Sequence, residues 1–505
     1  MRRVVSMVDE GGAVRSPCRS RVLETVLALR LLEVTDIAPD AAAAARAFLA
    51  RHAGAAVEPE RSLAAAVLSR CALSGDLLGG VVGRVPDFTG SRKRALVHAL
   101  GAVVDEGAVA GFGGWDEAAF SLSGLHSWAR VQVTAVKVIL ACAVGRPGAV
   151  TDEDVRRLQH TQQAARVWEG NVLIHLFVLH ALARLPGSGP VVAAGVRKAL
   201  MVQRPDGGWP FVTDTDTWCT VTAGVALAAN RAPQEVVHRV AGHLERCQQP
   251  AGGWSYTDWA CQTDVDDTSV AVQFLHQAGA VRYQAAIHRG LRSLRSVVGP
   301  DGGFPTYLAG GPSEACMTAA AVDALNLQPE RDERLIADAL RYLAAQQAAD
   351  GSFPPDWSTS RLHTLFRALL AAGRYPAPHP PHLERLVAHG RRLLRETQNA
   401  DGGFGQQPAH GSDPISTAYG LTALCATDDG DPAAAARAAA YLTTAVRDDG
   451  SVLSEPDSIG PRPFTFTVPA LAETFTLLAF GHLTERLTTA PAYPQSPLPA
   501  PGGRR

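Results

Sequence analysis

The sequence predicts an all-α protein built around an α/α toroid, in which one ring of helices encloses another. Apolar residues recur at intervals of three and four, as in residues 22–29, 173–182 and 362–369, whereas alternating strand patterns are rare. A glycine-aromatic turn returns about every fifty residues in the second half of the chain. Four of the turns follow an amphipathic segment that ends in glutamine, and four precede an apolar segment led by Thr or Ser. Fifty residues hold two helices and two turns, so about six such pairs are expected to close the toroid.

Taken in order, the chain begins with residues 1–18, which carry basic residues but no apolar run and are expected to be disordered. Residues 19–185 are predicted to form a second, degenerate α/α helical domain, because the periodicity is helical but the repeat is eroded. The Pro- and Gly-rich stretch 186–190 is the expected domain boundary.

Residues 186–487 are predicted to be the toroid. Its turns are at 205–209, 251–254, 301–304, 350–353 and 401–404, with a worn copy at 449–452. The last residues of successive turns are 45, 50, 49, 51 and 48 positions apart. Glycine follows each helix end because it adopts positive φ without strain. The aromatic residues Trp209, Trp254 and Phe404 are expected to pack their own turns onto a neighbouring helix. The Pro-rich end, 488–505, is expected to be disordered.

Residues 264–268 place three carboxylates, Asp264, Asp266 and Asp267, within four positions at the start of an apolar helix. Two interpretations are open on this pattern alone. An aspartate at a helix start caps the backbone and complements the helix dipole. Alternatively, mutual repulsion in a dry setting holds one carboxyl protonated near neutral pH, which makes it a general acid.

Composition excludes several classes of protein. The formal net charge of −2 over 505 residues argues against a nucleic-acid partner, which requires a basic surface. The eight cysteines form no C-x-x-C pair, so no metal centre is evident. No run approaches the roughly 18 apolar residues of a membrane span, and we expect a cytoplasmic protein. The sequence does not indicate the oligomeric state.

The glutamine-to-aromatic repeat and the Asp-x-Asp-Asp-Thr element together resemble the class II terpene cyclases, over roughly residues 190–485. This family includes the squalene-hopene cyclases and the bacterial diterpene and drimane-type cyclases. The resemblance implies that Asp266 is the general acid that protonates a terminal alkene, while Asp264 and Asp267 keep it protonated and oriented. It implies cyclisation of an isoprenoid, in the first place a C15 or C20 prenyl diphosphate whose diphosphate is retained, to a (bi)cyclic product. Mg²⁺ would accompany the diphosphate, and no organic cofactor is implied.

A carbocation is stabilised by aromatic faces. The candidates for this role are Trp357, Trp259, Tyr307, Phe353 and Tyr419, of which Phe353 ends a repeat turn. His363 is a candidate partner of Asp266 or acceptor of the final proton, with ordinary core packing as the alternative. Lys137, inside an apolar helix, is a candidate diphosphate ligand or a side chain that reaches solvent. The acidic stretch 151–154 indicates a helix start rather than a magnesium site.

Two family segments are missing. The Ser-x-Tyr-Asp-Thr-Ala-Trp-like start is absent, and residues 460–467 stand where a Lys-x-Leu-Tyr-x-Pro-like stretch is usual. These losses favour an alternative substrate without a diphosphate, such as a squalene-like hydrocarbon or a prenylated aromatic. A rival of another class is a non-catalytic toroid that serves as a binding scaffold. A protein prenyltransferase subunit is disfavoured because no zinc-ligand set of acid, cysteine and histidine is evident.

Overall fold

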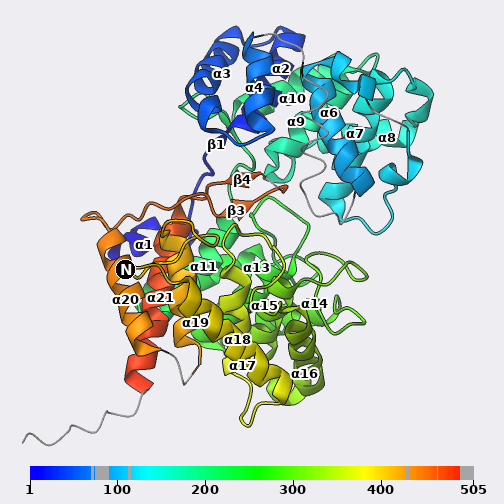
Figure 1. Ribbon diagram of the computed structural model, residues 1–505. Helices are drawn as coiled ribbons and strands as arrows, with labels where there is room; N and C mark the ends of the chain where they lie inside the picture. Colours follow the sequence, from blue (N-terminus) through cyan, green and yellow to red (C-terminus); the bar gives the residue numbers. More distant parts are fainter. Residues whose placement is uncertain (70–72, 74–89, 112–114, 428–430, 463, 490–505) are drawn as a thin grey trace, which may run out of the picture.

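The computed structural model describes residues 1–69, 73, 90–111, 115–427, 431–462 and 464–489. Two helical domains lie one above the other (Figure 1). Within the described residues the strands are four, each of two residues, in two antiparallel pairs. The predicted all-α class is therefore confirmed.

The lower domain is a closed double ring. Its inner helices are α11 (Asp216–Ala229), α13 (Val265–Gly279), α15 (Ala315–Leu325), α17 (His363–Gly373), α19 (Pro414–Cys425) and α21 (Ala470–Thr489). Each inner helix contacts the next, and α21 contacts α11, which closes the ring. The outer helices are α12 (Gln234–Cys247), α14 (Gln284–Arg295), α16 (Pro329–Gln346), α18 (Pro381–Thr397) and α20 (Pro432–Ala445). Figure 1 shows this arrangement, and the predicted toroid is confirmed.

The repeat turns join neighbouring outer helices, as the contacts of Gln248 illustrate. Its side-chain amide donates to the carbonyl of Gly252 at 2.7 Å and to the carbonyl of Ala286 in α14 at 2.9 Å. Gly252 has φ of +97°, and a Cβ there would lie 2.6 Å from the carbonyl oxygen of Arg289. Trp254 is fully buried and donates its indole N–H to the carbonyl of Leu244 at 2.7 Å. The turn tryptophan therefore packs its own repeat, as predicted, and so do the buried Trp209 and Phe404.

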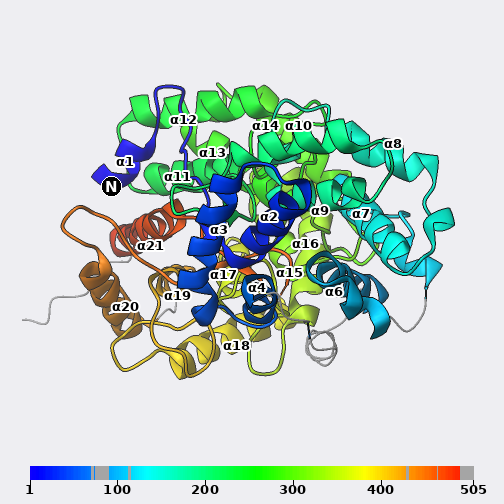
Figure 2. The same ribbon diagram turned by 90° about the horizontal axis from the view of Figure 1, so that it is seen from above.

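The upper domain begins with α2 (Val22–Thr35), α3 (Pro39–His52), α4 (Glu60–Ser69) and α6 (Gly90–Val104). It continues with α7 (Ser127–Ala143), α8 (Asp152–Thr161), α9 (Val172–Ala183) and α10 (Gly189–Leu200), connected by short 3₁₀ turns: η1 (Ala53–Ala55), η2 (Glu106–Gly111), η3 (Glu117–Phe120), η4 (Pro147–Ala149) and η5 (Trp168–Gly170). Figure 2 shows these helices lying across the toroid.

The predicted boundary at residues 186–190 is wrong, because α10 packs on α9 and α2. Its Val196 is buried in the upper core, and so is Trp209. The Pro-Gly stretch is therefore a turn inside the upper domain, and the toroid proper begins near Val212.

The N-terminal segment is ordered, and the prediction of disorder for residues 1–18 is wrong. It forms α1 (Arg2–Met7), which contacts α11 and α21. Val4 and Val14 are buried in the toroid core. The apolar residues are too few and too irregularly spaced to produce a periodic signal, although the toroid covers them. The first residues therefore belong to the lower domain.

Short strands connect the two domains. After α1 the chain rises to β1 (Ser20–Arg21), which pairs with β2 (Trp209–Pro210). Arg21 is buried, pairs with Glu24, and donates to the carbonyl of Gly460 at 2.7 Å. This carbonyl lies just after β3 (Ser458–Ile459), which pairs with β4 (Thr465–Phe466).

The C-terminal helix α21 ends at Thr489, so the first two residues of the predicted disordered tail are helical. Residues 490–505 lie outside the described part of the chain. None of the described helices combines the length and the apolar character that crossing a bilayer requires.

Candidate active site

The acidic motif lies at the N-terminus of inner helix α13. Asp264 is the N-cap, and its carboxylate accepts the backbone N–H of Asp267 at 2.8 Å. Its backbone also pairs with the repeat turn, since the N–H of Asp264 donates to the carbonyl of Trp254 at 3.0 Å. The capping interpretation is thus correct for Asp264, and the repeat turn fixes where the helix begins.

Burial changes the acidity of Asp264 and Asp267. It raises the pKa of Asp264 to about 7, with the neighbouring charge of Asp266 acting in the same direction. Burial, and then the charges of Asp264 and Asp266, raise the pKa of Asp267 well above its usual range. Asp267 Oδ1 is buried without a hydrogen-bond partner among the described residues, which suits a neutral carboxyl better than a carboxylate. This pair therefore retains a proton near neutral pH.

Asp266 is the ion-paired member of the cluster. Its carboxylate meets the guanidinium of Arg367, which extends from α17 on the far side of α15. Arg367 is only 7% exposed, so the carboxylate of Asp266 compensates a buried cation. The side chain of Asp266 is 16% exposed, whereas Asp264 and Asp267 are both buried. Asp266 is the most accessible of the three acids.

Aromatic rings surround this ion pair. The guanidinium of Arg367 lies 5.6 Å from the ring centroid of Trp218 and 5.7 Å from that of Phe366. Phe366 stacks on Tyr419 at 5.0 Å, and Phe475 of α21 meets Tyr419 edge-on at 4.9 Å. Of the predicted candidates the structure brings Tyr419 here. Trp218, Phe366 and Phe475 were not among the candidates, and their only signal was an aromatic residue within an inner-helix segment.

Tyr307 and Trp357 belong to a second aromatic group at the boundary of the two domains. Tyr307 stacks on His126 at 4.0 Å and meets Trp128 and Trp357 edge-on. Trp357 donates its indole N–H to Glu314 at 3.1 Å. The upper domain therefore supplies part of the surroundings of the motif helix.

Two predicted aromatic residues lie elsewhere. Trp259 is 46% exposed and stacks under the guanidinium of Arg166 at 4.1 Å. Phe353 is half-buried and packs against the apolar core of the toroid. Neither is placed beside Asp266.

His363 is buried next to Asp356 instead of Asp266. Its Nδ1 lies 2.8 Å from Asp356 Oδ2 and 3.5 Å from Cys316 Sγ. Burial opposes the charged imidazole, but the carboxylate of Asp356 prevails and raises the pKa of His363 well above its usual range. The expected hydrogen bond to Asp266 is therefore wrong, because Asp356 takes the imidazole and Arg367 takes the acid.

Lys137 does not face the motif. Its ammonium pairs with Asp154 at 2.8 Å within the upper domain. Asp154 also completes a capping box with Thr151 at the start of α8, which confirms that residues 151–154 are a helix start. Lys137 is engaged in this pair, so the prediction that it binds the diphosphate is wrong.

The comparisons with known proteins agree with this geometry. Residues 310–485 match the squalene-hopene cyclase C-terminal domain, and residues 214–363 match the prenyltransferase alpha-alpha toroid domain. A drimenyl diphosphate synthase from Streptantibioticus cattleyicolor is 38% identical over 95% of this chain and 93% of its own length. The chain belongs to the class II terpene cyclases. A second drimenyl diphosphate synthase, from Streptomyces showdoensis, is 36% identical over 96% of this cyclase and 93% of its own length.

The two-domain arrangement has a counterpart among solved structures. The ent-copalyl diphosphate synthase from Streptomyces platensis covers 95% of this cyclase and 98% of its own chain, with a TM-score of 0.55. The sequence identity is 14%, so this likeness concerns the fold. Membership of the family decides against a non-catalytic scaffold, and the cyclase is an enzyme.

Proposed function

We propose that this cyclase converts farnesyl diphosphate, a C15 prenyl diphosphate, into a bicyclic drimane-type diphosphate. The observation that carries the proposal is the similarity to two drimenyl diphosphate synthases along almost the whole chain. The reaction is an isomerisation: one proton enters at the terminal alkene, and one leaves from the last carbocation. The diphosphate stays attached, so no carbon–oxygen bond breaks.

The acid is the cluster of Asp264, Asp266 and Asp267 acting as a unit. Asp264 and Asp267 store the proton, which the perturbed pKa values of both residues support. Asp266, the most exposed of the three, receives the proton from these neighbours and presents it to the alkene. Arg367 then stabilises the carboxylate left on Asp266, and an acid whose conjugate base is stabilised donates its proton more readily. The stored proton returns Asp266 to its active form for the next turnover.

The carbocation is stabilised without a nucleophile. Trp218 and Phe366 offer rings close to Arg367, and the rings of Tyr419 and Phe475 extend this group. A ring face attracts a cation through its quadrupole and, unlike water, forms no bond with it. Tyr419 is held in place because its hydroxyl donates to Asp457 at 3.0 Å.

Magnesium would accompany the diphosphate, but the acidic stretch of the upper domain does not fit such a site. Asp154 is committed to Lys137 and to the capping box, and Glu153 pairs with Arg157. We therefore assign no magnesium ligand and derive no step from the ion.

The test is to incubate the wild type and Asp266→Asn with farnesyl and geranylgeranyl diphosphates, remove phosphate with a phosphatase, and identify the alcohols by gas chromatography. We expect a bicyclic C15 alcohol from the wild type only. Asp152→Asn, which removes an exposed carboxylate of α8, is the matched control and should retain activity. Cyclisation by Asp266→Asn at the wild-type rate would refute the acid assignment.

Farnesol separates the alternative substrate class. A cyclase that holds the diphosphate should turn over farnesyl diphosphate far better than farnesol, and inorganic diphosphate should compete. Equal turnover of the two would favour an isoprenoid without a diphosphate.

A further inference from the structure

A cluster of metal-binding side chains lies outside the active site, between outer helix α12 and the loop that leads to the acidic motif. It consists of His243, Cys247 and Asp258. Their ligand atoms lie within 4.8 Å of one another. His243 and Cys247 are four residues apart on α12 and therefore project from the same face of the helix. Asp258 belongs to the loop after the turn of Trp254, six residues before Asp264.

The spacing of these atoms suits a tetrahedral metal ion. His243 Nε2 lies 3.3 Å from Cys247 Sγ and 3.4 Å from Asp258 Oδ2. Around zinc, with bonds of about 2.0 Å to nitrogen and oxygen and about 2.3 Å to sulfur, tetrahedral neighbours are about 3.3–3.5 Å apart. Both distances from His243 Nε2 therefore match the separation of neighbouring ligands around a tetrahedral zinc ion.

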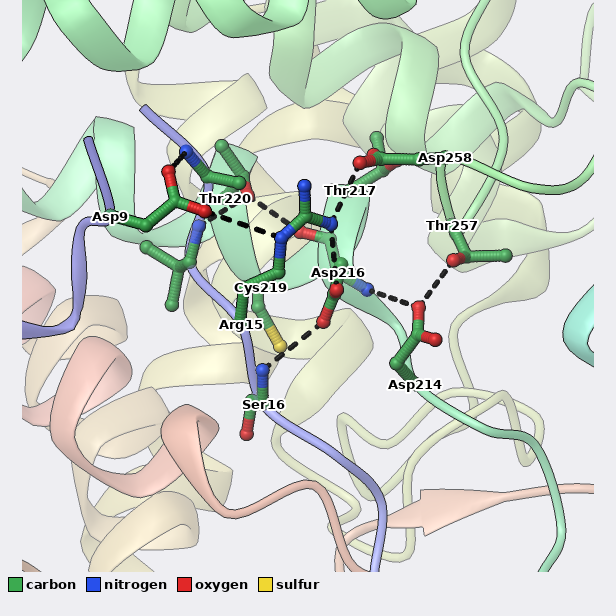
Figure 3. Close-up of polar contacts among 12 residues, drawn as sticks. Asp9, Arg15, Ser16, Asp214, Asp216, Thr217, Cys219, Thr220, Thr257 and Asp258 are labelled. Carbon is green, nitrogen blue, oxygen red and sulfur yellow. Dashed lines mark hydrogen bonds and ion pairs between the residues drawn. The ribbon is translucent and has the colours of Figure 1, made fainter. Parts of the chain in front are cut away.

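The surrounding charges favour another cation. Arg15 of the N-terminal segment donates to Asp216 and Asp258, both at 2.8 Å, and Asp9 lies 3.4 Å from the same guanidinium (Figure 3). Three carboxylates therefore share one arginine. The hydrogen bond from Arg15 falls on Asp258 Oδ2, the oxygen that faces His243, so a bound cation would share this oxygen with the guanidinium. Thr217 donates to Asp258 Oδ1 at 3.0 Å and so orients the carboxylate, as residues behind metal ligands commonly do.

We propose that His243, Cys247 and Asp258 bind one zinc ion, which joins α12 to the loop before the acidic motif. The mixed nitrogen, sulfur and oxygen ligands favour zinc over magnesium or calcium, which prefer oxygen alone. A water molecule completes the tetrahedron. The second cluster of this kind within the described residues, Cys316, Asp356 and His363, suits a cation less well. There the pair is tighter, with His363 Nδ1 2.8 Å from Asp356 Oδ2 against 3.4 Å between His243 Nε2 and Asp258 Oδ2, and Asp356 Oδ2 also accepts a hydrogen bond from Thr364.

The site was not recognisable from the sequence. A His-x-x-x-Cys pair on an amphipathic helix resembles ordinary core residues, and Asp258 follows it only after a turn and a loop. The position of Asp258 depends on the fold of the repeat.

The test uses the full chain, stripped with a chelator and titrated with zinc chloride by calorimetry, and with cobalt chloride by absorption spectroscopy. We expect one zinc per chain, a rise of several degrees in the unfolding temperature, and a thiolate-to-cobalt absorption band. Cys247→Ala and His243→Ala should weaken zinc binding at least tenfold, and Cys247→Ala should abolish the cobalt band. Cys261→Ser is the matched control, because Cys261 is an exposed thiol outside the cluster.

Circular dichroism shows whether each variant is folded, and Cys247→Ser provides a second variant of nearly the same size as the native residue. Absence of stoichiometric zinc in the wild type would overturn the proposal. Zinc binding that is undiminished in Cys247→Ala and Cys247→Ser would overturn it as well. Cyclase activity is not part of this readout, so the zinc site and the proposed reaction can fail separately.

Discussion

Replacing Arg367 with glutamine tests the division of labour within the acid cluster. The substitution keeps a polar side chain but removes the charge that Asp266 faces in the ion pair. A hydrogen bond to a charged group contributes about 1.5–3 kcal/mol. If this energy stabilises the Asp266 carboxylate formed by proton transfer, kcat should fall roughly 10- to 150-fold. The value of KM for farnesyl diphosphate should change much less, because the ion pair does not contact the diphosphate in our proposal.

The assay is a time course of product alcohol at saturating substrate, followed by a repeat at lower substrate to obtain KM. Arg361→Gln is the control: Arg361 lies two residues before α17 and pairs with the exposed Asp350. It should change kcat less than about twofold. The double variant Asp266→Asn with Arg367→Gln should be no slower than Asp266→Asn alone. An Arg367→Gln enzyme that is folded and fully active would refute the role assigned to the guanidinium.

Three further predictions concern pH and stability. The pKa of Asp264 in the folded protein is about 7, whereas the usual value is about 3.9. Between pH 4 and pH 7, roughly, the unfolded chain therefore binds fewer protons than the folded protein, and the free energy of unfolding falls as pH rises. Urea unfolding should show a lower free energy of unfolding at pH 8 than at pH 5. Asp264→Asn, which keeps a capping side chain, should reduce this difference between the two pH values, and an unchanged difference would contradict the raised pKa of Asp264. The turnover rate should also decline above about pH 7 as the stored proton is lost, and a rate that stays flat to about pH 9 would argue against Asp264 as part of the store. Gly252→Ala should lower the free energy of unfolding by at least about 1–2 kcal/mol in thermal unfolding, because the turn needs positive φ and has no space for a Cβ. In the control Gly148→Ala the added Cβ meets no atom within 4 Å, so the free energy of unfolding should change little.

The toroid could be predicted because the structure of each repeat is determined largely by residues close together in the sequence. The glutamine, the glycine and the aromatic residue of a turn act within one repeat and its neighbour, as the contacts of Gln248 and Trp254 demonstrate. The N-terminal segment could not be predicted in this way. Val14 and Arg15 are held by Thr220, Asp216 and Asp258, which lie more than 200 positions away. No local pattern indicates a contact over such a separation.

The acidic motif was recognisable for the same local reason, since three aspartates at the start of an inner helix combine cap and charge. The partners of each acid were not. His363 and Arg367 are four residues apart on α17, and nothing in the local pattern favoured the arginine as the neighbour of Asp266. The choice depends on how far α17 is rotated about its axis relative to α13, and that rotation is determined by packing across the whole ring.

The N-terminal segment has a consequence for the order in which the protein can fold. Ser16 accepts a hydrogen bond from the backbone of Ala470 at 3.1 Å, across 454 positions of chain. During synthesis the N-terminal segment therefore cannot form its native contacts until the last helix of the ring has been made. By then the upper domain has been fully synthesised and can already fold. The lower domain is thus the later of the two to fold, although residues 1–18 are synthesised before the upper domain. A truncated chain that starts at Val212 would lack this segment, and its core would lack the side chains of Val4 and Val14.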